Sequence, residues 1–109
     1  MDKKEFNKAE IFQLIDTIKY SNEAIVSKTV LNKETGTVTL FAFDKGQGLS
    51  EHTAPFDAMV SIIEGKGRII INNEKYDLNK GESIIMPANI PHAVEAIDKF
   101  KMLLVMIKS

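Results

Sequence analysis

The 109-residue chain contains no cysteine. Disulfides, thiolate metal sites and cysteine nucleophiles are therefore excluded, and burial of apolar side chains must hold the fold together. The chain also lacks any apolar run close to the roughly twenty residues that a membrane span requires. A soluble, cytoplasmic protein is the expectation.

The chain also lacks an excess of charge of either sign. The formal net charge is −1, and the lysines are scattered along the chain rather than gathered in a stripe. Nucleic acid is therefore not an expected partner, and neither is a membrane. With 44% hydrophobic residues the chain has enough apolar material for one modest core. A small-molecule ligand remains the partner to consider.

From residue 24 onward the pattern is that of short strands separated by glycine, proline and asparagine. Alternating and β-branched runs predict strands at 25–31, 37–43, 59–64, 68–71, 75–78, 83–86, 91–97 and 101–107. Gly65-Lys66-Gly67 is interpreted as a tight hairpin turn rather than a phosphate loop. Many short strands at regular spacing favour an all-β sandwich or barrel.

One helix is expected, over residues 6–19. Asn7 is placed to cap it, with Glu10 three residues on as in a capping box. Apolar residues then recur at helical spacing: Ile11, Leu14, Ile15 and Ile18. The predicted organisation is an N-terminal helical segment at 1–22 followed by a barrel at 23–109.

The chain has only two histidines, and each lies in a framework of glycine and proline. His52 follows Gly46 by six residues, and His92 follows Pro87 by five. Imidazole is the commonest metal ligand and titrates near neutral pH. Any chemistry of this protein is therefore expected to pass through His52 and His92.

These two frameworks resemble the motifs of the cupin superfamily. Gly46, His52 and Gly65 match the first cupin motif, and the second motif is matched by three further residues, Gly81, Pro87 and His92. The resemblance covers roughly residues 36–107. It implies a double-stranded β-helix, a jelly-roll barrel of antiparallel strands. It is nearest to the small single-domain bacterial cupins, which often form dimers.

The sequence departs from those motifs at four positions. Ala54 stands in place of the second motif histidine, and Ala58 in place of the motif glutamate. Asn89 replaces a glycine, which is tolerable because asparagine visits left-handed backbone, and Ala96 replaces an asparagine. Of the metal ligands that the resemblance implies, only His52 and His92 carry over. A weakly held divalent ion (Zn, Ni, Fe or Mn) is the cofactor hypothesis.

Strand alternation predicts an apolar lining around the two imidazoles. The predicted pocket-lining residues are Ala54, Phe56, Ala58, Met86, Val94, Ala96 and Met102. The same alternation turns the nearby carboxylates of Glu51 and Asp57 away from the inner face. A bulge at Pro55 would shift the register and return Asp57 to that face.

Two functions remain open. One is an isomerase- or lyase-like enzyme acting on a small metabolite such as a sugar or keto acid, with the histidines as metal ligands or as acid and base. The other is a non-catalytic small-molecule sensor or binding module without metal. A homodimer is expected in either case, because residues 30–31 and both faces of 102–107 are apolar.

Overall fold

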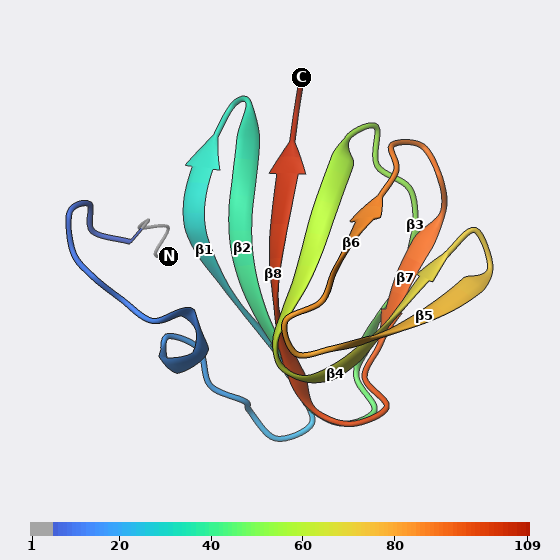
Figure 1. Ribbon diagram of the computed structural model, residues 1–109, viewed down its shortest axis with the longest axis horizontal. Helices are drawn as coiled ribbons and strands as arrows, with labels where there is room; N and C mark the ends of the chain where they lie inside the picture. Colours follow the sequence, from blue (N-terminus) through green and yellow to red (C-terminus); the bar gives the residue numbers. More distant parts are fainter. Residues whose placement is uncertain (1–5) are drawn as a thin grey trace.

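The computed structural model describes residues 6–109, which form eight strands and one 3-10 turn (Figure 1). The elements are η1 (Leu14–Asp16), β1 (Ile25–Lys33), β2 (Gly36–Phe43), β3 (Gly48–His52), β4 (Asp57–Ile71), β5 (Glu74–Asn79), β6 (Ser83–Met86), β7 (His92–Glu95) and β8 (Phe100–Ile107). Among residues 6–109 no helix is long and apolar enough to cross a membrane.

The strands curl into two facing antiparallel sheets that share β4. Sheet A has the order β1-β2-β8-β4-β6, and sheet B has the order β5-β4-β7-β3. The predicted all-β jelly-roll barrel is confirmed. The inner faces of both sheets form the core, and the outer faces look away from it (Figure 1).

The hairpin expected at residues 65–67 is wrong, because β4 runs through these residues without turning. It leaves sheet A at Gly65 and pairs with β5 from Lys66 onward. A Cβ on Gly65 would lie 2.6 Å from the Lys99 carbonyl oxygen, and one on Gly67 would lie 2.6 Å from the Phe100 ring. The two glycines therefore let a bending strand pass close to Phe100.

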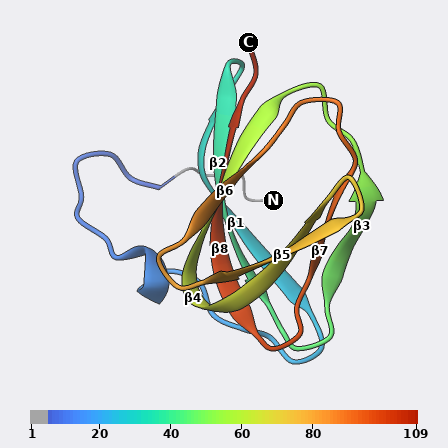
Figure 2. The ribbon, with the colours of Figure 1, turned by 45° about the vertical axis from the view of Figure 1, so that its right-hand side comes forward.

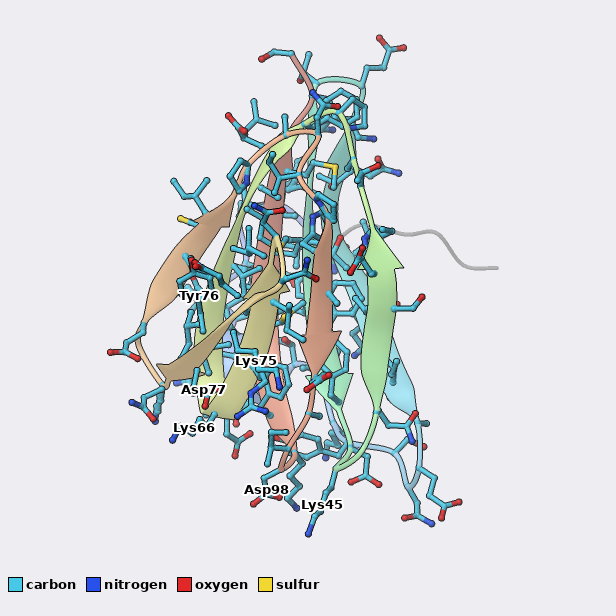
Figure 3. All side chains as sticks on the ribbon, turned by 90° about the vertical axis from the view of Figure 1, so that its right-hand side faces the viewer. Lys45, Lys66, Lys75, Tyr76, Asp77 and Asp98 are labelled. Carbon is cyan, nitrogen blue, oxygen red and sulfur yellow. The ribbon has the colours of Figure 1, made fainter. Side chains whose placement is uncertain are left out.

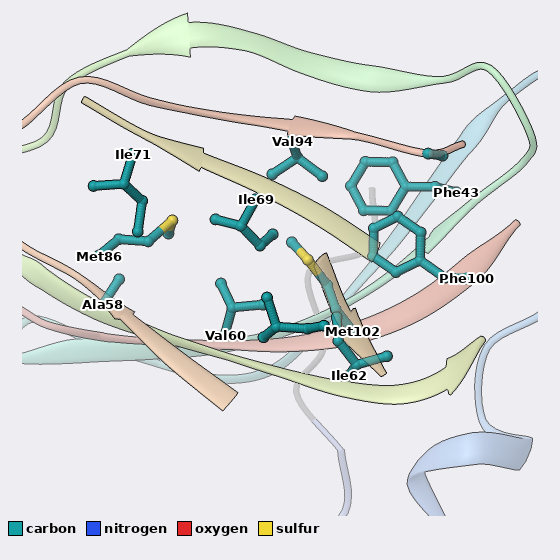
Figure 4. Packing of buried hydrophobic residues seen from close by; sticks show 12 residues of the cluster. Phe43, Ala58, Val60, Ile62, Ile69, Ile71, Met86, Val94, Phe100 and Met102 are labelled. Atoms are coloured by element: carbon teal, nitrogen blue, oxygen red, sulfur yellow. The ribbon is translucent and has the colours of Figure 1, made fainter. Parts of the chain in front are cut away.

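The interior is filled by aliphatic side chains and closed at one end by aromatic rings. Phe43 and Phe100 stack with centroids 4.8 Å apart and both are fully buried. Figure 4 shows this pair at one end of the cluster, with Ile71, Met86 and Ala58 at the other. The barrel therefore has a closed aromatic end and an opposite aliphatic end.

The predicted N-terminal helix is wrong: within residues 6–22 only the three-residue turn η1 is helical. We call residues 6–22 the N-terminal strap. Asn7, the expected cap, donates its side-chain amide to Glu10 at 3.3 Å, and Ala9 has a positive φ of 61°. A short helix depends on tertiary packing. Here Ile11 is fully exposed while Ile18 is buried, so the apolar residues do not face the barrel as one helical stripe. Residues 1–5 of the predicted segment lie outside the described residues.

The strap lies against the outer face of sheet A beside β1 and β2 (Figures 1 and 2). Ile18 is fully buried there, and it belongs to a second apolar cluster with Val30, Leu40 and Ala42. Part of the surface that had been expected to need a second subunit is therefore covered by the chain itself.

A polar cluster fastens the strap to the barrel. The Lys101 ammonium donates to the Ile15 carbonyl at 2.7 Å and lies 3.2 Å from the Glu64 carboxylate. The Tyr20 hydroxyl donates to the same carboxylate at 3.2 Å. Burial and the nearby Glu64 charge raise the pKa of Tyr20 well above its usual value. This hydroxyl therefore stays protonated, and remains a hydrogen-bond donor, at neutral pH.

Candidate functional site

The structure brings the two histidines together, although forty residues separate them in sequence. His52 ends β3 and His92 begins β7, and their Cα atoms are partners in the ladder between these strands. The ring centroids lie 4.4 Å apart with the planes at 71°. His52 is exposed and His92 is only 6% exposed, so one ring faces solvent and the other lies beneath it.

Both imidazoles make the same backbone contact. Nδ1 of His52 lies 2.7 Å from the Ser50 carbonyl oxygen, and Nδ1 of His92 lies 3.2 Å from the Ile90 carbonyl oxygen. A carbonyl oxygen only accepts, so each Nδ1 must carry the proton and donate it. In the neutral rings Nε2 then holds the free lone pair, which can accept a proton or bind a metal ion.

Burial lowers the pKa of His92 below its ordinary value of 6.5. The second cause, the hydrogen bond to Ile90, opposes this shift, while the neighbouring His52 adds to it. His92 is therefore neutral at pH 7 and available as a base.

The lowered pKa of His92 predicts a pH-dependent stability. The unfolded chain takes up this proton at a higher pH than the folded chain does, so the stabilisation is complete above pH 6.5 and is lost as the pH falls below it. Urea denaturation between pH 8 and pH 5 is expected to show this decline, and His92→Phe is expected to flatten it. A His92 ring whose NMR titration midpoint lies at or above 6.5 would contradict the prediction.

The loops that carry the two motifs are tied to each other beside the histidines. The backbone N–H of Asn89 donates to the Ala54 carbonyl at 2.7 Å, and the backbone N–H of Ala88 donates to the Asp57 carboxylate at 2.8 Å. Asn89 has the expected positive φ, at 65°. Asp57 thus anchors a loop from the outer side of β4.

Metal-ligating groups are few at this site. Within residues 6–109 no group of three or more His, Cys, Asp or Glu side chains is placed to hold a metal ion. Ala54 and Ala58 present methyl groups at the two other motif positions. Catalytic zinc normally has three protein ligands, so the side chains present fit a two-imidazole site and not a complete catalytic metal centre.

The predicted lining residues are divided between two depths of the barrel. Ala58 and Met86 are cross-strand partners and lie at the aliphatic end with Ile71 (Figure 4). Ile71 is in turn the partner of His92, which places the histidines at this end. Val94 and Met102 lie nearer the Phe43–Phe100 pair (Figure 4). Ala96 is buried in the same cluster, and Ala54 and Phe56 are half-buried in the loop after His52.

Sequence reasoning missed one carboxylate on the histidine side of the barrel. Glu74, Ile71, His92 and His52 are successive cross-strand partners from β5 to β3, so they share one row on the inner face of sheet B. Glu74 accepts a hydrogen bond from the Tyr76 hydroxyl at 2.8 Å, and Figure 3 shows Tyr76 at the β5 side of the molecule. The two-residue turn Asn72-Asn73 was the available signal, because it makes 71 and 74 partners.

Comparisons with known proteins agree with this fold. Residues 39–108 match the model of the cupin domain family. A conserved protein of unknown function from Streptococcus pyogenes is 36% identical, with a TM-score of 0.91 over 97% of this chain and 93% of that chain. A cupin 2 conserved barrel domain protein from Leptotrichia buccalis is 42% identical, with a TM-score of 0.87 over 89% of this chain and 47% of that one.

A curated relative matches over a shorter segment. An uncharacterized protein of Methanocaldococcus jannaschii is 42% identical over 36 residues, which is 33% of this chain and 29% of the relative. The match therefore spans less than a third of that protein's length.

The fold and the paired histidines define a small β-barrel protein whose candidate site lies at the aliphatic end. The family match over residues 39–108 makes the assignment plain: the chain belongs to the cupin domain family. The resemblance seen in the two sequence motifs is confirmed.

Proposed function

We propose that this cupin binds a small metabolite at the His52–His92 pair and acts on it as an isomerase- or lyase-like enzyme. The observation that carries the proposal is the contact that the two rings share, in which Nδ1 of each lies against a backbone carbonyl. Two Nε2 atoms then remain for a ligand, on rings whose centroids lie 4.4 Å apart.

The position of the rings limits the chemistry. His52 and His92 stand on adjacent strands of sheet B, so both approach a ligand from one wall of the barrel. Proton transfer along a single face of the substrate suits such a pair, as between a carbon and its neighbouring carbon or oxygen. Removal and return of a proton from opposite faces would need bases on opposite walls. A ketose or a keto acid, in which a proton moves next to a carbonyl, is the substrate class we favour.

A difference in burial gives the two rings different roles. The lowered pKa of His92 keeps it neutral at pH 7, so it accepts a proton from the substrate. His52, the exposed ring of the pair, is the one in contact with solvent. A divalent ion such as Zn²⁺ would be held by the two Nε2 atoms alone, with water or ligand in its other positions, and would act as a Lewis acid.

The alternative is a non-catalytic sensor or binding module without metal. Ala54 and Ala58 favour it, because methyl groups at these positions leave the histidines without further polar partners. Proton exchange with substrate separates the two functions, since a binding module has no reason to catalyse it.

The test uses pyruvate as a keto acid and fructose as a ketose, each in D₂O at neutral pH. The wild-type protein is expected to accelerate deuterium incorporation into at least one of them, measured by ¹H NMR. His92→Ala is expected to lower this rate by about 100-fold, within the usual range for a general base. His52→Ala should also lower it. Asp57→Asn is the control, because Asp57 serves a loop amide outside the site, and its rate should match wild type.

The wild-type protein and the three variants also distinguish a metal-dependent mechanism from acid–base catalysis without metal. Calorimetric titration with Zn²⁺ is expected to show weak binding to wild type and to Asp57→Asn, removable with chelator, and none to either alanine variant. Equal Zn²⁺ binding by all four proteins would exclude the histidines as ligands. If the protein does not accelerate deuterium incorporation into either pyruvate or fructose above the rate in buffer, the non-catalytic binding module remains as the function.

A further inference from the structure

The inner face of sheet A is polar where β1 and β2 form it. Thr37 lies in one cross-strand row with the core residue Ala58, and Thr39 lies in the next row with Val60. Thr29 on β1 is the partner of Thr39. Side chains of one row point to the same side of a sheet, so all three threonines point into the barrel. We call Thr29, Thr37 and Thr39 the inner threonines.

The inner threonines face the strand that carries His52. Four residues, 44–47, join β2 to β3, and four others, 96–99, join β7 to β8. These two loops lie side by side, because the Gly46 N–H donates to the Ala96 carbonyl at 2.8 Å. The chain therefore passes from sheet A to sheet B between β2 and β3, so β2 faces β3 across the barrel. Figure 3 shows β1 in blue behind β3 in green.

Thr37 also lies at the same depth as the two histidines. Its row includes Met86, and the histidine row includes Ile71. Figure 4 shows Met86 beside Ile71 at the aliphatic end. Thr37 therefore stands opposite the two imidazoles, with Thr39 one row deeper.

All three threonine hydroxyls are available to a ligand. Thr29, Thr37 and Thr39 are half-buried, and within residues 6–109 no hydrogen bond engages their hydroxyls. No side-chain oxygen of this part of the chain is both fully buried and without a partner, so these hydroxyls remain in contact with solvent. A threonine hydroxyl donates one hydrogen bond and accepts two. Three such groups suit a ligand that carries several hydroxyls of its own.

Positive charge is absent from the inner face of the described strands. Their lysine and arginine side chains all stand at outward positions of the ladders: Lys28, Lys33, Lys66, Arg68, Lys75 and Lys101. The inward charge on the histidine row is the carboxylate of Glu74. A ligand carboxylate would therefore meet no lysine or arginine inside the barrel and would be repelled by Glu74.

We propose that the ligand of the His52–His92 site is a neutral, polyhydroxylated carbonyl compound, a ketose and not a keto acid, and that the inner threonines bind its hydroxyl groups. This proposal rests on the function proposed above, because it names the substrate of the same two imidazoles. The carbonyl end of the ketose lies at the imidazoles on sheet B. Its remaining hydroxyls extend toward β2 on sheet A. Facing sheets are about 10 Å apart, a separation that an open-chain ketose can span.

Calorimetric titration with fructose tests the inner threonines. Thr39→Val is expected to weaken fructose binding about three- to tenfold, the usual worth of one neutral hydrogen bond. Thr37→Val/Thr39→Val should weaken it at least about tenfold. Valine keeps the branched shape and suits a strand, so these variants should fold. Thr35→Val is the control, because Thr35 is exposed in the turn between β1 and β2, and its affinity should equal that of wild type.

The same titrations with pyruvate test the class of ligand. Wild type is expected to bind fructose more tightly than pyruvate, and the threonine variants should leave pyruvate binding unchanged. Failure of wild type to bind fructose, tighter binding of pyruvate, or equal fructose affinity in all four proteins would overturn the proposal.

Binding and proton exchange separate this proposal from the proposed function. Fructose binding that depends on Thr39, without deuterium incorporation into fructose, would refute the enzyme and support the ligand class. Exchange that is catalysed in pyruvate but not in fructose would retain the enzyme and overturn the ligand class.

A charge reversal tests the role of Glu74. Glu74→Lys is expected to tighten pyruvate binding at least about threefold at low ionic strength, because an inward cation replaces an inward carboxylate. Glu34→Lys is the control, since it changes the net charge equally but lies in the exposed turn between β1 and β2. Equal pyruvate affinity in the two variants would overturn the argument from charge, and with it the preference for a neutral ligand.

Discussion

Replacement of Phe100 by alanine is expected to lower the free energy of unfolding by about 3–5 kcal/mol, the usual cost of deleting a buried aromatic ring. Phe100 is fully buried and stacks on Phe43 at 4.8 Å. Its loss opens a void at the closed end of the barrel, between two sheets that β4 holds in place. Urea denaturation measures this loss, provided that the m-value is the same in the variant and the wild-type protein.

Phe12→Ala provides the comparison for this prediction. Phe12 lies in the N-terminal strap and is 42% exposed, with its ring against that of Phe6 at 4.8 Å. Its replacement should cost below about 1 kcal/mol, since little of its surface leaves water. A Phe100→Ala protein as stable as Phe12→Ala would mean that the Phe43–Phe100 stack does not close the barrel as described.

Gly67→Ala is expected to destabilise the protein by about 1–3 kcal/mol, the range for overpacking a filled core. The added Cβ would lie 2.6 Å from the Phe100 ring. The backbone of β4 cannot move away easily, because Gly67 is paired with Leu78 on β5. Denaturation of the single variant measures this cost.

The double variant Gly67→Ala/Phe100→Ala isolates the cause. Once the ring is absent, the extra methyl group enters vacated space, so Gly67→Ala should cost little in the Phe100→Ala background. If the losses of unfolding free energy in the two single variants simply add in the double variant, Gly67 matters for its backbone conformation and not for its approach to Phe100.

Most of the strands could be predicted from the sequence because alternation and turn residues are local signals. The runs 37–43, 75–78 and 83–86 correspond closely to β2, β5 and β6. Gly65-Lys66-Gly67 was misleading for a tertiary reason. Glycine marks a tight turn and a close approach of backbone to a side chain equally well, and only the position of Phe100 decides between the two.

In the N-terminal strap the local signals predicted a helix that the structure does not contain. Its apolar spacing and capping pattern favour a helix, and both are real features of the sequence. Tertiary contacts override them, because Lys101 and Glu64 hold the strap through Ile15 and Tyr20. These partners lie more than forty residues away in sequence, so no local pattern reports them.

The candidate site could be predicted in part. Motif spacing alone indicates that His52 and His92 belong together, and strand parity correctly turns Asp57 outward. The row that links Glu74 to the histidines depends on the register of three ladders. The burial of His92 and the exposure of His52 depend on packing, and burial of His92 is the main cause of its lowered pKa.

The placement of β8 between β2 and β4 has a consequence for how the barrel is made in the cell. Sheet A has no link between its first two strands and β4 until residues 100–107 pair with both. A chain still being synthesised therefore exposes two unpaired, largely apolar strand edges until this segment leaves the ribosome. Pairings so distant in sequence form slowly, so the barrel is expected to fold only after residues 100–107 have been synthesised, and chaperones can bind the unpaired strands in that interval.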